Sequence, residues 1–178
     1  MIWLFAISMA PLAQTQQEKA YTIVDPGPKF LQEKDPAKRI ALLDKFVASH
    51  HPTPAVLLYV YQGYCQAYGE LKNPMKVMEY ADKLADLGTE VELGMRFNAR
   101  YMWVAAYDSL NSDDPQLAAN AGQRAAEAMK LLSGIPKPQN INDQKWLEQK
   151  TKFNLFLQAA SNKAANVLKD HSERQQPN

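Results

Sequence analysis

Residues 67–74 read Ala-Tyr-Gly-Glu-Leu-Lys-Asn-Pro, and 39 residues later the pattern returns at 106–115 as Ala-Tyr-Asp-Ser-Leu-Asn-Ser-Asp-Asp-Pro. A third Asx-Pro step, Asp35-Pro36, precedes both copies. Asp and Asn are preferred N-cap residues, and proline at the first helical position has no N–H to leave unsatisfied. The three steps therefore predict helices that begin at residues 36, 74 and 115.

The stretches between these steps carry the apolar spacing of amphipathic helices. Apolar residues within 54–71 recur at i, i+4, i+7, i+8 and i+11, and 90–110 has a similar stripe. Gly88 is placed to end the helix that begins at residue 74, and the Ser-Gly-Ile-Pro-Lys-Pro run at 133–138 ends the third. A last helical stretch at 143–170 forms one helix or two. A period near 40 residues with paired helices is typical of an α-solenoid.

The repeat resembles the tetratricopeptide repeat superfamily over roughly residues 30–135. Tyr68 and Tyr107 align with the conserved tyrosine of that repeat, and Tyr64 and Trp103 occupy the large core position before it. The resemblance implies an all-α fold, a short right-handed α-solenoid of about six helices in antiparallel pairs. We expect this helical repeat domain to cover 31–172, with a disordered tail at 173–178.

The chain also departs from the family pattern. Cys65 and Val104 replace the glycine of the first helix, and Lys72 and Asn111 replace the glycine of the turn that follows it. The opening stretch at 35–46 resembles exported bacterial proteins of this class. The resemblance is to a divergent member, and related helical-repeat families remain an alternative.

The resemblance also implies a concave groove lined by the first helix of each pair. The family's groove positions fall on these residues: Tyr59, Gln62, Gln66 and Glu70 in the first repeat, and Asn98, Tyr101, Ala105, Asp108 and Ser109 in the second. Rings, amides and acids of this kind hold an extended peptide through hydrogen bonds and ring contacts. The set lacks the Lys/Arg clamp that some family members use on a partner's terminal carboxylate. Alternatively, these side chains are solvated or face another copy of the protein.

Composition narrows the function. The 178 residues include 20 Lys+Arg and 19 Asp+Glu, a formal net charge of +1, which argues against a nucleic-acid partner because such proteins cluster basic residues. A single cysteine excludes intrachain disulfides and multi-cysteine metal sites, and there are three histidines. No nucleophile, base and orienting group occur together in a known catalytic pattern. We expect no catalytic residue, no metal site and no cofactor.

Three features that could carry chemistry have simpler interpretations. Cys65 lies on the apolar stripe of its helix, so we expect a small buried hydrophobe rather than a nucleophile. The adjacent pair His50-His51 stands at a helix end, where imidazolium favours the C-terminal dipole. Asp114 resembles half of an acidic pair for acid–base work, but an N-cap explains it better.

The first residues predict export. Residues 2–10 carry no charge and are too few to span a bilayer, so 1–13 is expected to be a signal peptide cleaved near Ala13. The alternative is an apolar cap on the core of a cytoplasmic protein. Residues 14–30 are expected to form an extended tether; 20–24, its only stretch with strand propensity, would in a second interpretation add to a partner's sheet.

These observations favour a non-catalytic interaction module of the cell envelope or a secreted one, which binds a protein or peptide partner in the groove. The alternative is a structural subunit of a homo-oligomer or filament, because repeat arrays have open ends that stack head to tail. In both cases the mature chain is expected to lack a membrane span.

Overall fold

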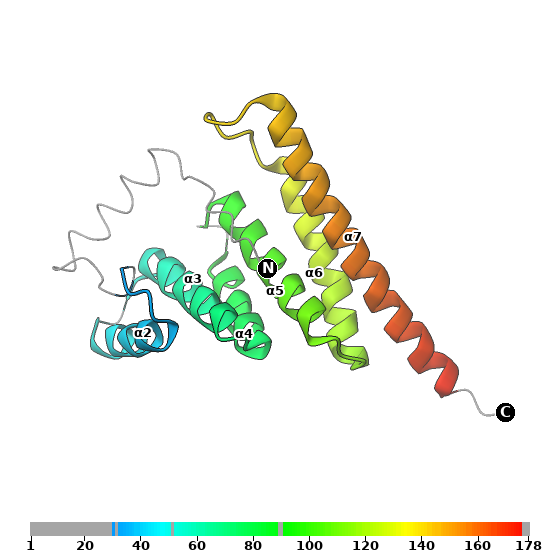
Figure 1. Ribbon diagram of the computed structural model, residues 1–178, viewed down its shortest axis with the longest axis horizontal. Helices are drawn as coiled ribbons and strands as arrows, with labels where there is room; N and C mark the ends of the chain where they lie inside the picture. The colour runs from blue at the N-terminus through cyan, green and yellow to red at the C-terminus, as the bar shows by residue number, and fades with distance from the viewer. Residues whose placement is uncertain (1–29, 31, 51, 89–90, 176–178) are drawn as a thin grey trace.

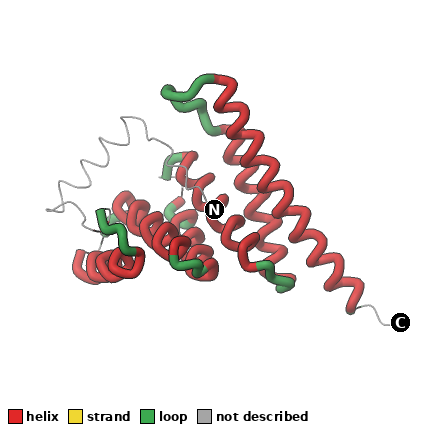
Figure 2. The backbone as a smooth tube through the Cα atoms, in the orientation of Figure 1, coloured by secondary structure: helices red, strands yellow, loops and turns green. Residues whose placement is uncertain are grey.

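The computed structural model describes residues 30, 32–50, 52–88 and 91–175. Within these residues the fold is all-helical, with six α-helices and no strand, as expected (Figure 2). The helices are α2 (Pro36–His50), α3 (Pro54–Glu70), α4 (Pro74–Ala85), α5 (Leu93–Leu110), α6 (Pro115–Gly134) and α7 (Asp143–Arg174). The predicted signal peptide at 1–13 and nearly all of the predicted tether lie outside the described residues.

The three predicted Asx-Pro starts are confirmed, because each Asx side chain accepts hydrogen bonds from the first turn of its helix. Asp35 Oδ1 accepts from two backbone N–H groups at 2.9 and 3.1 Å. Asn73 Oδ1 accepts from one at 3.2 Å, and Asp114 Oδ1 accepts from two at 2.7 and 3.1 Å. Asn142 caps α7 in the same way, at 2.8 Å.

Other boundaries differ from the predictions. Helix α5 begins at Leu93 rather than at residue 90, because Glu92 has extended ψ and serves as the N-cap. Helix α4 ends at Ala85, ahead of Gly88. Helix α7 is one continuous helix that passes residues 170 and 172 and ends at Arg174. Its buried residues Leu157, Ala160 and Ala164 follow helical spacing without interruption, so the stretch at 143–170 belongs to one helix rather than two.

The helices follow one another across the molecule, from α2 at one end to α7 at the other (Figure 1). Each packs mainly against its neighbours in sequence, and α7 also contacts α5. The core is therefore spread along the row in three clusters. The first joins α2 to α3 around Leu43 and Phe46, the second extends from α3 to α7 around Trp103, and the third joins α5, α6 and α7 around Phe97 and Leu157.

Small residues let α6 lie close to its neighbours. Ala118, Ala121, Ala125 and Ala128 are fully buried and follow one another at helical spacing. A side chain of one carbon lets helix axes approach closely, and it keeps helix propensity at its maximum. Helix α6 is consequently packed on two sides, by α5 and by α7.

The two turns that contain Lys72 and Asn111 share one backbone conformation. Lys72 has φ 55° and Asn111 has φ 50°, so both lie in the left-handed region. Asn tolerates that region through local hydrogen bonds, whereas lysine is strained there by its Cβ. The sequence repeat is thus also a repeat of backbone geometry, set by the position rather than by the residue type.

We expect Lys72→Gly to raise the free energy of unfolding by about 0.5–1 kcal/mol, because glycine adopts positive φ without a Cβ clash. Urea denaturation of the full chain measures the change. Lys72→Ala is the matched control: it removes the amine but keeps the Cβ, so it should give no gain. A gain of equal size from the alanine variant would contradict the strain argument.

Candidate functional site

The predicted groove positions form one stripe on α3 and one on α5. Tyr59, Gln62 and Gln66 are half-buried and stand at i, i+3 and i+7 of α3, and Glu70 is exposed at the end of that helix. The second stripe contains Asn98, Tyr101, Ala105 and Asp108, which are half-buried at the corresponding spacing of α5, and the exposed Ser109.

Helix α7 covers part of the second stripe. The ring of Tyr101 lies 5.2 Å from the rings of Phe153 and Phe156 of α7 and 5.8 Å from that of Phe97. Burial raises the pKa of the Tyr101 hydroxyl above its usual range. Tyr101 therefore belongs to the packing between α5 and α7.

Two acidic groove positions are paired within the chain. Lys163 Nζ of α7 donates to the backbone oxygen of Asp108 at 3.0 Å and to its Oδ1 at 3.2 Å. Arg39 Nη1 of α2 donates to Glu70 Oε1 at 3.0 Å, and its Nε donates to the backbone oxygen of Glu33 at 2.9 Å. These two carboxylates are neutralised by the helices beside them, so they add little net charge to the surface.

The three amides differ from these residues. Gln62, Gln66 and Asn98 are half-buried, and their side chains make no hydrogen bond to any other residue in the described part of the chain. An amide offers two N–H donors and a carbonyl acceptor, and polar groups at such depth normally have partners in protein or solvent. These amides are therefore the groove positions with unused hydrogen-bonding capacity.

Asp82 of α4 forms a polar centre that the sequence reasoning missed. Trp103 Nε1 donates to Asp82 Oδ2 at 3.0 Å, and Arg124 Nε and Nη2 donate to Oδ1 at 3.0 and 2.8 Å. The Arg124 guanidinium also lies over the Trp103 ring, 4.5 Å from its centroid. Arg100 adds a longer contact to Asp82 at 3.5 Å. This centre ties α4, α5 and α6 together.

The first repeat contains a simpler version of the same contact. Tyr64 donates its hydroxyl to Asp44 Oδ1 at 2.6 Å, from the position that Trp103 takes in the second repeat. Asp44 and Asp82 occupy matching places in the repeated Asp-Lys element. The sequence thus contained a pattern that could have predicted the Asp82 centre. In both repeats an acid on one helix is followed, at the matching position of the next helix, by an aromatic residue that can donate a hydrogen bond.

The tyrosines of α3 and α4 form a stacked group within the core. Tyr80 lies 4.1 Å from Tyr64 and 5.6 Å from Tyr68, ring centroid to ring centroid. Burial, with smaller contributions from nearby acids and tyrosines, raises the pKa of Tyr80 to about 12. These rings therefore pack against one another between α3 and α4.

Tyr107 has the one buried side-chain polar atom without a hydrogen-bond partner in the part of the chain that the structure describes. The residue is fully buried and its ring stacks with Trp103 at 6.3 Å. Burial raises the pKa of its hydroxyl, and the negative charges of Asp108 and Asp114 make smaller contributions in the same direction. The ring contributes packing, and its hydroxyl is not placed to act on a ligand.

Cys65 is a buried residue, as expected. Its side chain is 2% exposed, and Sγ lies 3.7 Å from the backbone oxygen of Val77, to which the thiol donates. Burial raises the pKa of the thiol to about 12, so it stays protonated at neutral pH.

Of the adjacent histidines, His50 is described and His51 lies outside the described residues. His50 Nδ1 lies 3.1 Å from the backbone oxygen of Phe46, and the rings of His50 and Phe46 stack with their centroids 4.8 Å apart.

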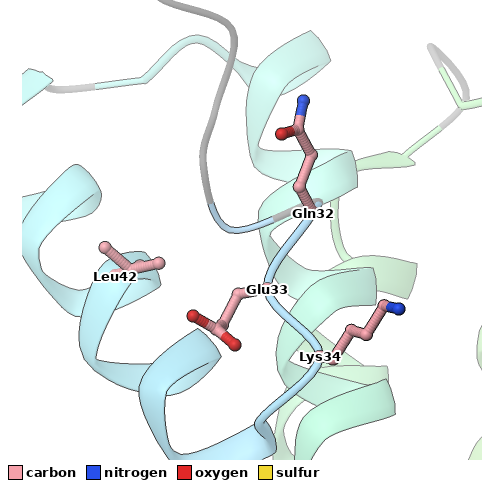
Figure 3. Close-up of a pocket in the computed structure, with 4 residues that line it drawn as sticks. All are labelled: Gln32, Glu33, Lys34 and Leu42. Carbon is pink, nitrogen blue, oxygen red and sulfur yellow. The ribbon is translucent and has the colours of Figure 1, made fainter.

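Open depressions lie on the surface of the described residues. One depression is lined by Gln32, Glu33, Lys34 and Leu42; in it the Glu33 side chain extends toward α2, whereas Gln32 and Lys34 point elsewhere (Figure 3). Another depression lies at the end of α7.

No three His, Cys, Asp or Glu side chains among the described residues are grouped to hold a metal ion. None of the helices described is long and apolar enough to cross a membrane.

Comparison with known proteins found no matching family model, no similar curated protein and no similar solved structure.

Proposed function

We propose that the chain is a non-catalytic interaction module that binds a protein or peptide partner through Gln62, Gln66 and Asn98. The observation that carries the proposal is that these three half-buried amides have no partner among the described residues. They stand on α3 and α5, the first helices of successive pairs. In this proposal the helices form a short α-solenoid that is a divergent relative of the tetratricopeptide repeats.

The repeated contacts support the solenoid. Asp44 bonds Tyr64 and Asp82 bonds Trp103 at matching steps of the sequence, and left-handed residues close the two matching turns. Each helix packs mainly against its sequence neighbours, which is the contact pattern of a repeat array. An array of this kind presents matching helix faces in a row, so an extended ligand meets one amide set after another.

The groove chemistry favours main-chain recognition. Amide side chains donate to and accept from a peptide backbone whatever its side chains are. The two acids among the groove positions are already paired, Glu70 with Arg39 and Asp108 with Lys163, so neither is an unpaired charge that would select a charged ligand. The partner segment in this proposal is an extended, largely uncharged peptide.

The proposal places the module in the periplasm, at the cell surface or outside the cell, after cleavage of the signal peptide.

The test is a triple variant, Gln62→Ala with Gln66→Ala and Asn98→Ala. Tagged protein is incubated with the envelope fraction of the native cells, and retained polypeptides are quantified by mass spectrometry. We expect specific partners to fall at least tenfold, while the free energy of unfolding changes by no more than about 0.5 kcal/mol per site, as for other substitutions outside the core.

The matched control changes three amides of α6: Gln116→Ala with Asn120→Ala and Gln123→Ala. This variant should retain the same partners as the unchanged protein. Equal capture by the α3/α5 triple variant and the unchanged protein would refute the groove assignment.

A structural role in a homo-oligomer is the second candidate. The observation that favours it is the exposure of Leu147 and Leu155 on α7, each 66% exposed. Apolar side chains so exposed on the last described helix favour contact with another molecule.

A further inference from the structure

The chain enters the described part of the structure beside the end of the predicted groove. The guanidinium of Arg39 on α2 donates from Nε to the backbone oxygen of Glu33 at 2.9 Å. The same guanidinium donates from Nη1 to Oε1 of Glu70, the groove position at the end of α3, at 3.0 Å. Phe30, three positions before Glu33, is 2% exposed, and its ring packs edge-on against that of Phe46. The residues before Phe30 are therefore attached to the fold at a point close to the groove.

The preceding stretch is long enough to lie across the groove. Val24 stands nine positions before Glu33, and an extended chain spans roughly 3.3 Å per residue, so the two residues can be about 30 Å apart. Along α3, the eight positions from Glu70 back to Gln62 take up about 12 Å at 1.5 Å per residue. Helices α3 and α5 share one core cluster, and packed helices lie about 8–10 Å apart. Residues 20–24 can therefore reach both helices.

The sequence of residues 20–24 suits the groove chemically. It reads Ala-Tyr-Thr-Ile-Val, carries no charge and has strand propensity. The main-chain N–H and C=O groups of an extended segment need hydrogen-bond partners when they leave water. The described residues offer no strand to pair with, whereas Gln62, Gln66 and Asn98 make no hydrogen bond to another described residue. Each of these amides can donate to and accept from a main chain, so the two sides are complementary.

We propose that residues 20–24 bind across Gln62, Gln66 and Asn98 of the same molecule, so that a partner has to displace them. This internal occupancy rests on the proposed function, because it concerns the same groove and regulates access to it. A segment joined by a short linker is present at an effective concentration in the millimolar range. It therefore competes with a partner peptide of similar intrinsic affinity, and it weakens partner binding until it is displaced.

Cross-linking within one molecule tests the contact. In the full chain with Thr22→Cys and Gln66→Cys, a short bismaleimide should give a product of single-chain mass, and mass spectrometry should map the link to these two positions. Cys65 is buried and does not compete. In the control, Thr22→Cys with Gln123→Cys, the second thiol stands exposed on α6 and should stay unlinked. Absence of the single-chain product, a product of two-chain mass in its place, or equal linking in the control would each overturn the proposal.

Peptide binding tests the competition. The probe is a fluorescein-labelled peptide with the sequence of residues 18–26, and fluorescence anisotropy follows its binding to the full chain. Tyr21→Asp with Ile23→Asp in the chain should release the internal segment, because carboxylates lose hydration when they enter a half-buried groove. The peptide should then bind at least tenfold more tightly than it binds the unchanged chain. The control Gln16→Asp with Gln17→Asp adds the same charge outside residues 20–24 and should bind the peptide like the unchanged chain.

The results also separate internal occupancy from the proposed function. Equal peptide binding by the Tyr21→Asp/Ile23→Asp chain and the unchanged chain would refute internal occupancy, whatever the envelope fraction yields. When Gln62→Ala, Gln66→Ala and Asn98→Ala are added to the released chain, the gain in peptide binding should disappear, and a gain that persists would place the segment elsewhere and refute the proposal. Peptide binding that depends on the three amides, with no partner captured from the envelope fraction, would support internal occupancy and refute only the partner-binding role.

Discussion

Tyr101→Ala should lower the free energy of unfolding by about 3 kcal/mol, as for other large-to-small changes in packed aromatic groups. The ring contacts Phe97, Phe153 and Phe156, so its removal leaves a cavity between α5 and α7. Because these contacts help to hold α7 against α5, the amide protons of α7 should also exchange faster. Chemical denaturation and hydrogen exchange measure the two effects.

A side chain that only faced a partner would behave differently. Gln62→Ala, at a groove position of α3 with no hydrogen bond to another described residue, should change the unfolding free energy by no more than about 0.5 kcal/mol. Tyr101→Phe is the second control: it keeps the ring contacts and should retain nearly all the stability. If Tyr101→Ala proved as mild as Gln62→Ala, the packing of α7 on α5 would be contradicted.

Asp82→Ala should cost about 2–3 kcal/mol of unfolding free energy, because it leaves the Arg124 guanidinium and the Trp103 indole N–H without their shared acceptor, whereas Arg100 keeps its closer pair with Glu127 at 2.6 Å. The value lies below that of a fully buried ion pair since the Asp82 side chain is 35% exposed and solvent screens it. Trp103 fluorescence should report the change as well, because its Nε1 loses the carboxylate at 3.0 Å. Urea denaturation followed by tryptophan fluorescence measures both the loss of unfolding free energy and the change in the emission of the folded protein.

The equivalent position in the first repeat supplies the matched control. Asp44→Ala removes one hydrogen bond, from the Tyr64 hydroxyl, and should cost about 1–1.5 kcal/mol. Asp82→Asn keeps an acceptor for Trp103 but not the charge that faces Arg124, so it should fall between the two alanine variants. A loss from Asp82→Ala no larger than that from Asp44→Ala would mean that the arginines contribute nothing to the centre.

For the groove residues, the sequence predicted the positions along each helix but not the contacts with other helices. The spacing of Asn98, Tyr101 and Asp108 correctly placed them on one stripe of one helix, because that depends only on helical periodicity. It carried no information about α7, whose Phe153 and Lys163 lie 52 and 55 residues beyond Tyr101 and Asp108 and now cover those positions. Gln62 and Gln66 stand on α3, which packs mainly against α2 and α4, and their side chains make no hydrogen bond to another described residue.

The sequence by itself determined the features whose physical cause is local. Helix starts at Pro36, Pro74 and Pro115 follow from cap hydrogen bonds that span two or three residues, and the all-helical fold follows from apolar spacing within each segment. Only the tertiary structure decided which polar groups meet. Asp82 collects donors that are 21 and 42 residues away, and α7 folds back over α5, because such contacts depend on how whole helices pack rather than on any short stretch of chain.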